Sequence, residues 1–207
     1  MNPYKLPMHQ TQAEFIEKKS RFIGHIARVS SAEEALEFLR LVRTEHSDAN
    51  HNVYAYRIKE GGICRHSDDG EPSGTAGMPL LDVFLKQDIY DFCCVATRYF
   101  GGVMLGAGGL IRAYSRCATI AIEAAGIGIM REVASCSALV PYAMYEQIKR
   151  LFNSCGAQII SEKFEVNVEI KISIPSEDLP ELQIKFVELT SDSVKLQVDG
   201  MSYQVFG

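Results

Sequence analysis

The stretch VNVEIKISI, residues Val166–Ile174, alternates apolar and polar side chains with a period of two. This period puts the apolar side chains on one face of a β-strand, so the stretch predicts a strand with one buried face. The neighbouring patterns predict strands at Glu132–Val140, Ala157–Lys163 and Ser193–Val198, and helices at Tyr142–Asn153 and Glu177–Val187. The resulting βαββαβ order is that of ferredoxin-like domains.

The residues before this domain mix strands and helices in a different order. Strands are predicted at Ser20–Val29, Val53–Ile58, Ile63–His66 and Asp91–Thr97, and helices at Ser31–Glu45, Gly77–Lys86 and Leu110–Ala125. Gly61 and Gly62 predict the turn of a hairpin, because glycine adopts positive φ without steric cost. The sequence therefore indicates an α+β protein with two domains, residues 1–130 and 131–207.

Two helix ends carry local signals. Ser31 followed by Glu34 fits a capping box at the start of the first helix, and Leu36, Leu39 and Val42 are expected to form its buried stripe. Gly126 and Gly128 are expected to stop the helix that precedes the second domain.

The composition of the chain excludes several classes of protein. The 207 residues are 47% hydrophobic and 23% charged, with a net charge of −5, which is ordinary for a globular protein and argues against broad coating of nucleic acid. No stretch reaches the roughly 18 apolar residues of a membrane span, and the N-terminus has no signal-peptide pattern. Because no such span is visible, no membrane partner is expected. Six scattered cysteines without a C-x-x-C pair predict reduced thiols in a cytoplasmic protein.

The run DDGEPSGTAG, residues Asp68–Gly77, contains no large apolar side chain. Its carboxylates are Asp68, Asp69 and Glu71, and its hydroxyls are Ser73 and Thr75. The carboxylates are candidates for acid–base chemistry or Mg²⁺ binding, with loop ordering or ligand recognition as the alternative. The hydroxyls are candidates both for ligand contact and for capping the next helix.

A second unusual run, RYFGGVMLGAGGLIRAYS at Arg98–Ser115, joins a predicted strand to a helix. Its glycines are Gly101, Gly102, Gly106, Gly108 and Gly109. Backbone amides at such a turn, assisted by the helix dipole, favour an anion, and the alternative is tight packing of the turn. Arg65, Arg98 and Arg112 are candidate phosphate ligands, and Arg116 lies one helical turn after Arg112. The alternative is that arginines here pair with the nearby carboxylates.

The aromatic residues and the histidines give weaker evidence for a binding site. Tyr99 and Phe100, with Tyr54 and Tyr56, are candidates for stacking on a base, although aromatic side chains on strands more often belong to the core. His46 and His51 are five residues apart, which does not fit a zinc-binding helical pair. No metal site and no cofactor are therefore expected.

HSDDGEPSGTAGMPLL and VATRYFGGVMLGAGGLIRAYS, with the earlier blocks SRFIGHI and HNVYAYR, resemble the IMPACT family of the YigZ type. The resemblance implies an α/β sandwich like ribosomal protein S5 domain 2, followed by a ferredoxin-like domain like the last domain of elongation factor G. Eukaryotic relatives regulate translation by competing for the activator of a starvation-sensing kinase, which implies a link to translation and stress response. The family supplies no catalytic residues, and Val53 stands where cysteine is common in its histidine block.

Together these features predict a binding protein linked to regulation of translation, with RNA, the ribosome or another phosphate-bearing ligand as its target. The predicted site is a cleft between the loop at residues 68–77 and the turn at 98–112. Two alternatives stay open at this point. One is an enzyme acting on a phosphorylated small molecule or nucleotide, and the other is a module that binds a protein partner of the translation machinery.

Overall fold

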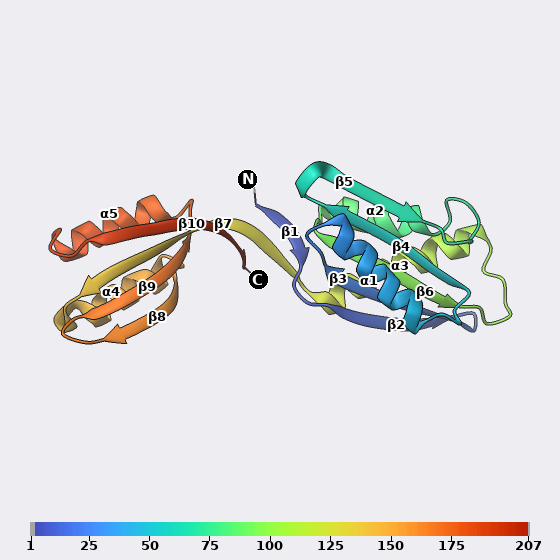
Figure 1. Ribbon diagram of the computed structural model, residues 1–207, viewed down its shortest axis with the longest axis horizontal. Helices are drawn as coiled ribbons and strands as arrows, with labels where there is room; N and C mark the ends of the chain where they lie inside the picture. The colour runs from blue at the N-terminus through green and yellow to red at the C-terminus, as the bar shows by residue number, and fades with distance from the viewer. Residues whose placement is uncertain (1–2, 207) are drawn as a thin grey trace. The chain divides into compact units, whose positions relative to one another are not determined.

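The computed structural model describes residues 3–206, which divide into two compact units, Tyr4–Ile129 and Met130–Phe206 (Figure 1). Pro3 groups with the second unit. Within these residues the chain forms five α-helices, one short 3-10 helix at Glu60–Gly62 and ten strands. The two units are described separately below as the first unit and the second unit.

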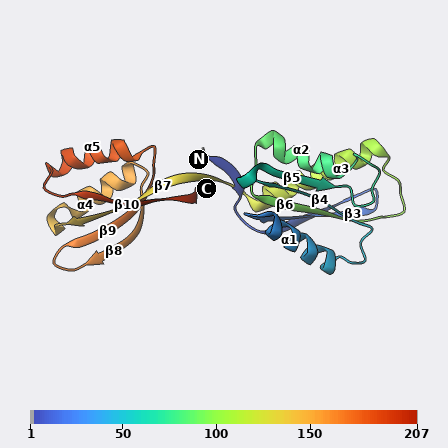
Figure 2. The ribbon, with the colours of Figure 1, turned by 45° about the horizontal axis from the view of Figure 1, so that its top comes forward.

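The first unit is built on an antiparallel sheet with the strand order β2-β3-β6-β4-β5. Its strands are β2 (Thr11–Glu17), β3 (Ser20–Arg28), β4 (His51–Ile58), β5 (Ile63–Ser67) and β6 (Phe92–Tyr99). Its helices are α1 (Ala32–Glu45), α2 (Gly77–Gln87) and α3 (Ala107–Ala125). Figure 2 shows α1 on one face of this sheet and α2 with α3 on the other.

Each face of this sheet has its own core, as the period-two pattern of the strands requires. The face toward α2 and α3 buries Phe22, Phe92 and Cys94, whereas the face toward α1 buries Val95 and Cys93. The adjacent cysteines thus point to opposite faces. Burial raises the pKa of the Cys93 thiol to about 12, so this side chain behaves as a small apolar residue.

Helix α1 confirms the predicted capping box at its start and corrects the predicted set of buried apolar residues. The Ser31 hydroxyl accepts a hydrogen bond from the Glu34 amide at 3.2 Å, as in a capping box, while the Glu34 carboxylate accepts from the amide of Ser30 rather than Ser31. Leu36 is 51% exposed, so its assignment to the stripe was wrong; Phe38 is buried instead. The sheet meets the helix along Ala35, Phe38, Leu39 and Val42, which lie three or four residues apart.

The second unit has the ferredoxin-like arrangement. Its elements are β7 (Ile127–Val140), α4 (Tyr142–Ser154), β8 (Gln158–Phe164), β9 (Val168–Pro175), α5 (Leu179–Thr190) and β10 (Leu196–Phe206). The strands lie in the order β8-β9-β7-β10, and alternate residues of β7 and β9 pack with Phe152 of α4 and Phe186 of α5. The predicted fold class, α+β with a βαββαβ second half, is confirmed.

The N-terminal region contains two strands that the pattern did not predict, β1 (Tyr4–Pro7) and β2. β1 pairs with β7. Gly126 ends α3 with a φ of 66°, as predicted. Gly128, however, lies inside β7, so its assignment as a helix stop was wrong: β7 begins directly after Gly126 and needs no second glycine.

Candidate functional site

Asp68 organises the acidic loop by capping α2. Its Oδ1 accepts hydrogen bonds from the amides of Ala76 (3.1 Å) and Gly77 (2.7 Å), and its Oδ2 accepts from Gly74 (2.9 Å). Burial by itself would raise the pKa of Asp68, but these three amides outweigh it and hold the pKa below its usual value. Asp68 therefore serves as the acceptor for orphan amides at a helix start.

This contact corrects the predicted helix caps. Thr75 is buried and donates its hydroxyl to the carbonyl of Pro72 at 2.6 Å, while Ser73 is exposed. Neither hydroxyl caps α2, which begins after Ala76 without a cap from a neighbouring side chain. A carboxylate eight residues upstream takes that role because the loop turns back on itself.

Asp69 ties the loop to two other elements. Its Oδ2 accepts from the amide of Asn52 in β4 at 2.6 Å, and its Oδ1 accepts from the guanidinium of Arg43 in α1 at 2.6 Å. Its carbonyl oxygen lies 2.8 Å from Nδ1 of His51. The residue has a φ of 45°, a left-handed conformation that aspartate tolerates better than most residues.

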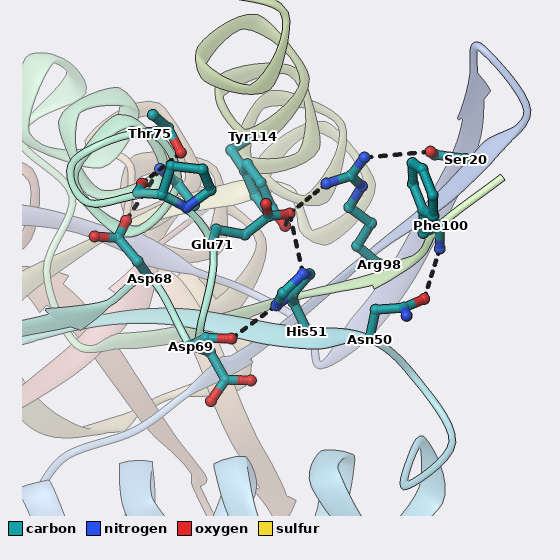
Figure 3. Close-up of polar contacts among 12 residues, drawn as sticks. Ser20, Asn50, His51, Asp68, Asp69, Glu71, Thr75, Arg98, Phe100 and Tyr114 are labelled. Carbon is teal, nitrogen blue, oxygen red and sulfur yellow. Dashed lines mark hydrogen bonds and ion pairs between the residues drawn. The ribbon is translucent and has the colours of Figure 1, made fainter. Parts of the chain in front are cut away.

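Glu71 forms the centre of a buried polar network (Figure 3). Its Oε1 accepts from Arg98 at 2.6 Å and from the Tyr114 hydroxyl at 2.7 Å, and lies 3.8 Å from Nε2 of His51. Glu71 and Arg98 are both nearly inaccessible, at 8% and 5% exposed. Burial and the adjacent carboxylate raise the pKa of Tyr114, which keeps its hydroxyl as a hydrogen-bond donor.

The alternative in which arginine pairs with carboxylate therefore holds at Arg98. A second guanidinium nitrogen of Arg98 contacts the Ser20 hydroxyl at 3.4 Å, and Ser20 also accepts from the amide of Gly101 at 3.2 Å. The acidic loop and the glycine-rich turn are thus joined through a buried ion pair. This contact commits Arg98 to Glu71.

The glycines of the turn serve different purposes. A Cβ on Gly101 would lie 2.0 Å from the backbone of Lys19, so this glycine permits two chain segments to touch. Gly106 precedes α3 with a φ of 72°, and no side chain caps the helix. Gly102, Gly106 and Gly108 are exposed, and Gly109 is partly exposed. The first amides of α3 therefore lie at the surface with the positive end of a 19-residue helix behind them.

A cavity of about 190 Å³ lies beside this helix start, between α3 and the turn that joins β2 to β3. Lys18, Arg112 and Arg116 bring positive charge to its lining, together with Phe15, Glu17, Leu105, Gly109 and Ala113. Arg112 is exposed and forms no ion pair with any residue in the 3–206 range. Arg116 is 3.9 Å from Glu17, a long contact between exposed groups, so the lining keeps an excess of cations.

The structure separates some of the predicted site residues from this cavity. Arg65 lies on β5 and donates to its neighbour's carbonyl, that of Cys64, at 2.8 Å. The Tyr99 hydroxyl contacts Nδ1 of His46 at 2.9 Å and Asp48 at 3.1 Å. Tyr54 and Tyr56 pack with the core on the α1 face. Phe100 remains 46% exposed.

Sequence reasoning missed one cation, Lys18, and two members of the buried network, whereas it noted Arg116 beside Arg112. A hairpin turn at Lys18 could have been recognised in FIEKKSRFI, because apolar residues flank a charged centre. Lys18 and Lys19 have φ of 46° and 67°, as a two-residue hairpin turn requires. Arg116 follows Arg112 by one helical turn. No local signal identifies His51 or Tyr114 as partners of Glu71.

Across residues 3–206 no group of three or more His, Cys, Asp or Glu side chains is arranged to hold a metal ion. No helix in this range is long and apolar enough to cross a membrane.

The fold and these loops define an α+β protein with an Impact N-terminal domain, since that family matches residues 18–122. A domain of unknown function, DUF1949, matches residues 139–193. The chain is 35% identical to IMPACT family member YvyE of Bacillus subtilis over 191 residues, covering 92% of this chain and 88% of the relative. It is 30% identical to IMPACT family member YigZ of Escherichia coli over 182 residues, covering 86% and 89%. The chain belongs to the IMPACT family.

A solved structure resembles this chain over almost its whole length. The crystal structure of a hypothetical protein covers 97% of this chain and 98% of its own, with a TM-score of 0.61 and 28% sequence identity. The predicted family and fold class are thereby confirmed.

Proposed function

We propose that this protein is a cytoplasmic binding protein of the translation machinery that holds a phosphate-bearing ligand, single-stranded RNA, at the start of α3. One observation carries the proposal: the uncapped amides of α3 lie next to a cavity lined by Lys18, Arg112 and Arg116. The link to translation rests on the IMPACT family, whose eukaryotic relatives regulate it. Six unpaired cysteines suit a reducing compartment.

Charge and backbone geometry act together at this place. Guanidinium groups bind phosphate through paired hydrogen bonds, and exposed amides at a helix N-terminus favour an anion. Arg112 and Arg116 lie one helical turn apart, a spacing that presents both cations on one side of α3. Because Arg98 is committed to Glu71, these two arginines, rather than Arg98, are the proposed phosphate ligands.

Apolar side chains beside the turn provide surface for the bases. Phe100 is 46% exposed and Met104 is 84% exposed. The backbone amide of Phe100 donates to Asn50 Oδ1 at 2.7 Å, and the Arg98 guanidinium lies 5.4 Å from the ring centroid. A half-exposed aromatic ring in a basic region is a feature that proteins use to stack the bases of single-stranded nucleic acid.

The double variant Arg112→Ala/Arg116→Ala tests this proposal. We expect its affinity for a short single-stranded RNA to fall about tenfold or more, because two charge-assisted contacts are lost. The log–log salt slope should become shallower by about 1.4, the value for two phosphates on a single strand. Fluorescence anisotropy at several salt concentrations measures both.

The matched control is Lys86→Ala/Arg150→Ala, which removes the same charge from exposed positions in α2 and α4. It should leave the affinity within about twofold of the wild type, since distant surface charges are screened at physiological salt. Equal losses in the two double variants would show nonspecific attraction. An unchanged affinity in Arg112→Ala/Arg116→Ala would contradict the proposed site.

A further inference from the structure

A groove runs along α1 on the face of the sheet opposite α3. One part of it, about 540 Å³, is lined by Gln10–Gln12, by His25 of β3 and by α1 residues from Phe38 to Glu45. A second part, about 470 Å³, shares Gln10, Phe38 and Leu41 with the first and continues along α1 to Glu33. The two cavities therefore adjoin at these shared residues, and together they are called the α1 groove below.

The floor of the α1 groove includes an edge strand. β2 pairs with β3, and with no other strand formed by residues 3–206, and Gln12 lies directly opposite His25 in that pairing. At the outer edge of an antiparallel pair, every second residue directs its amide and carbonyl away from the sheet. Such an edge accepts an extended peptide as an additional strand.

His25 supplies an unsatisfied polar group next to the groove. The residue is 4% exposed, and its Nε2 has no hydrogen-bond partner among residues 3–206. Burial, and to a lesser degree the charge of His46, lower the pKa of His25 to about 4, so the ring is neutral at pH 7. Buried polar atoms in native proteins nearly always have partners, and this one lies behind the groove lining, so a peptide would satisfy it only if the lining moved to admit a polar group.

The rim of the groove favours positive charge on the occupant. Four glutamates line it: Glu33, Glu34, Glu37 and Glu45. Arg28 is the one cationic lining residue within the described chain. Glu37 is already paired with Arg40 at 2.7 Å, so the excess of negative charge comes from the other three glutamates. Leu41 lies among them and is 52% exposed. An apolar strip bordered by carboxylates matches a segment that alternates basic and apolar side chains.

We infer that the α1 groove binds an extended, basic peptide segment of a partner protein, which pairs with the edge of β2 and packs apolar side chains against Phe38 and Leu41. This site is distinct from the proposed RNA site, because α1 and α3 cover opposite faces of the sheet (Figure 2). Failure of one proposal therefore leaves the other in place.

The probe is a library of synthetic decapeptides that alternate Lys or Arg with Val, Ile, Leu or Tyr, with a charge-inverted library of Asp or Glu as comparison. Fluorescence anisotropy with the full chain measures binding. Leu41→Glu should weaken the best basic peptide about tenfold, as expected for a buried anchor. The matched control is Leu36→Glu on the same helix, since Leu36 is equally exposed at 51% but lines none of the groove.

N-methylation of alternate amides in the best peptide tests the strand pairing, because it removes backbone donors while keeping the side chains. We expect one methylation register to abolish binding and the other to preserve it, and excess single-stranded RNA to leave the peptide bound. The inference is overturned if no basic peptide binds, if acidic peptides bind as tightly, or if Leu36→Glu is as damaging as Leu41→Glu. Equal effects of both methylation registers would also overturn it.

Discussion

The acidic loop at residues 68–77 has three carboxylates and two hydroxyls, whereas the glycine-rich turn at 100–109 has only backbone polar groups, and the structure treats the polar groups of the two regions in opposite ways. In the loop, Asp68, Asp69 and Glu71 each hold two or more partners within the protein. Beside the turn, the first amides of α3 and the guanidinium of Arg112 have none among the described residues. Polar density alone therefore does not mark a binding site; unsatisfied polar groups at the surface do.

The largest expected effect lies inside the network of the loop. Arg98→Ala leaves the Glu71 carboxylate buried without its cation, and we expect the free energy of unfolding to fall by about 3–5 kcal/mol. Urea unfolding of the full chain measures this. Arg112→Ala, which removes an exposed arginine from the turn side, should change stability by no more than about 0.5 kcal/mol.

The stabilities of Arg98→Ala and Arg112→Ala together test whether Glu71 is held by a buried ion pair. If Arg98→Ala and Arg112→Ala prove equally mild, Glu71 is not held by a buried ion pair, and the two regions do not differ as described. The double variant Glu71→Leu/Arg98→Met should recover much of the loss, since apolar replacement of a buried pair is often neutral.

A smaller effect separates two glycines of the turn. Gly101→Ala would place a Cβ 2.0 Å from the Lys19 backbone, and we expect a loss of about 2–3 kcal/mol because backbone must move. In Gly108→Ala the new Cβ would have only the flexible end of Arg112 nearby, at 3.7 Å. Because alanine loses less conformational freedom than glycine in a helix, the free energy of unfolding should rise by about 0.5–1 kcal/mol. Thermal unfolding of both variants ranks them, and a loss at Gly108 equal to that at Gly101 would contradict the distinction.

The smallest expected effect concerns the charge that caps α2. Asp68→Asn keeps one acceptor but loses the charge and the second oxygen, so we expect a loss of about 1 kcal/mol at pH 7. The native state lowers the pKa of Asp68, so its stabilisation is present above the unfolded pKa of about 3.8 and disappears as pH falls through the lower, native value. The wild type and the variant should therefore converge in acid.

Urea midpoints between pH 7 and pH 3 test this convergence. Asp82→Asn is the matched control, because Asp82 lies in α2 itself and should change stability by at most about 0.5 kcal/mol at any of these pH values. A gap between Asp68→Asn and wild type that stays constant down to pH 3 would show that the charge does not contribute to the cap.

Sequence patterns predicted much of the fold for a local reason. The alternation at Val166–Ile174 and the capping pair Ser31 and Glu34 report on backbone conformation within a few residues. The pattern failed at β2, where Gln12, Glu14 and Ile16 are exposed and only alternate residues are partly covered. It also failed at Leu36, because leucine occurs on exposed helix faces without consequence.

The candidate site was only half predictable. The glycine run and Arg112 were found because a strand-to-helix turn rich in glycine is a local pattern. The roles of Arg98 and Arg112 could not be distinguished, since both are arginines near the same turn. Lys18 was missed because it reaches the cavity from a hairpin about ninety residues earlier in the sequence.

The sequence by itself determined the family, the α+β class and most of the strands and helices, because each rests on side-chain periodicity or on contiguous motifs. Only the tertiary structure decided which charges are free. Asp68 accepts from amides six, eight and nine residues away, and Glu71 contacts Arg98 and Tyr114 across 27 and 43 residues. Whether a polar group is satisfied depends on partners brought together by folding, and that separates the closed loop from the open start of α3.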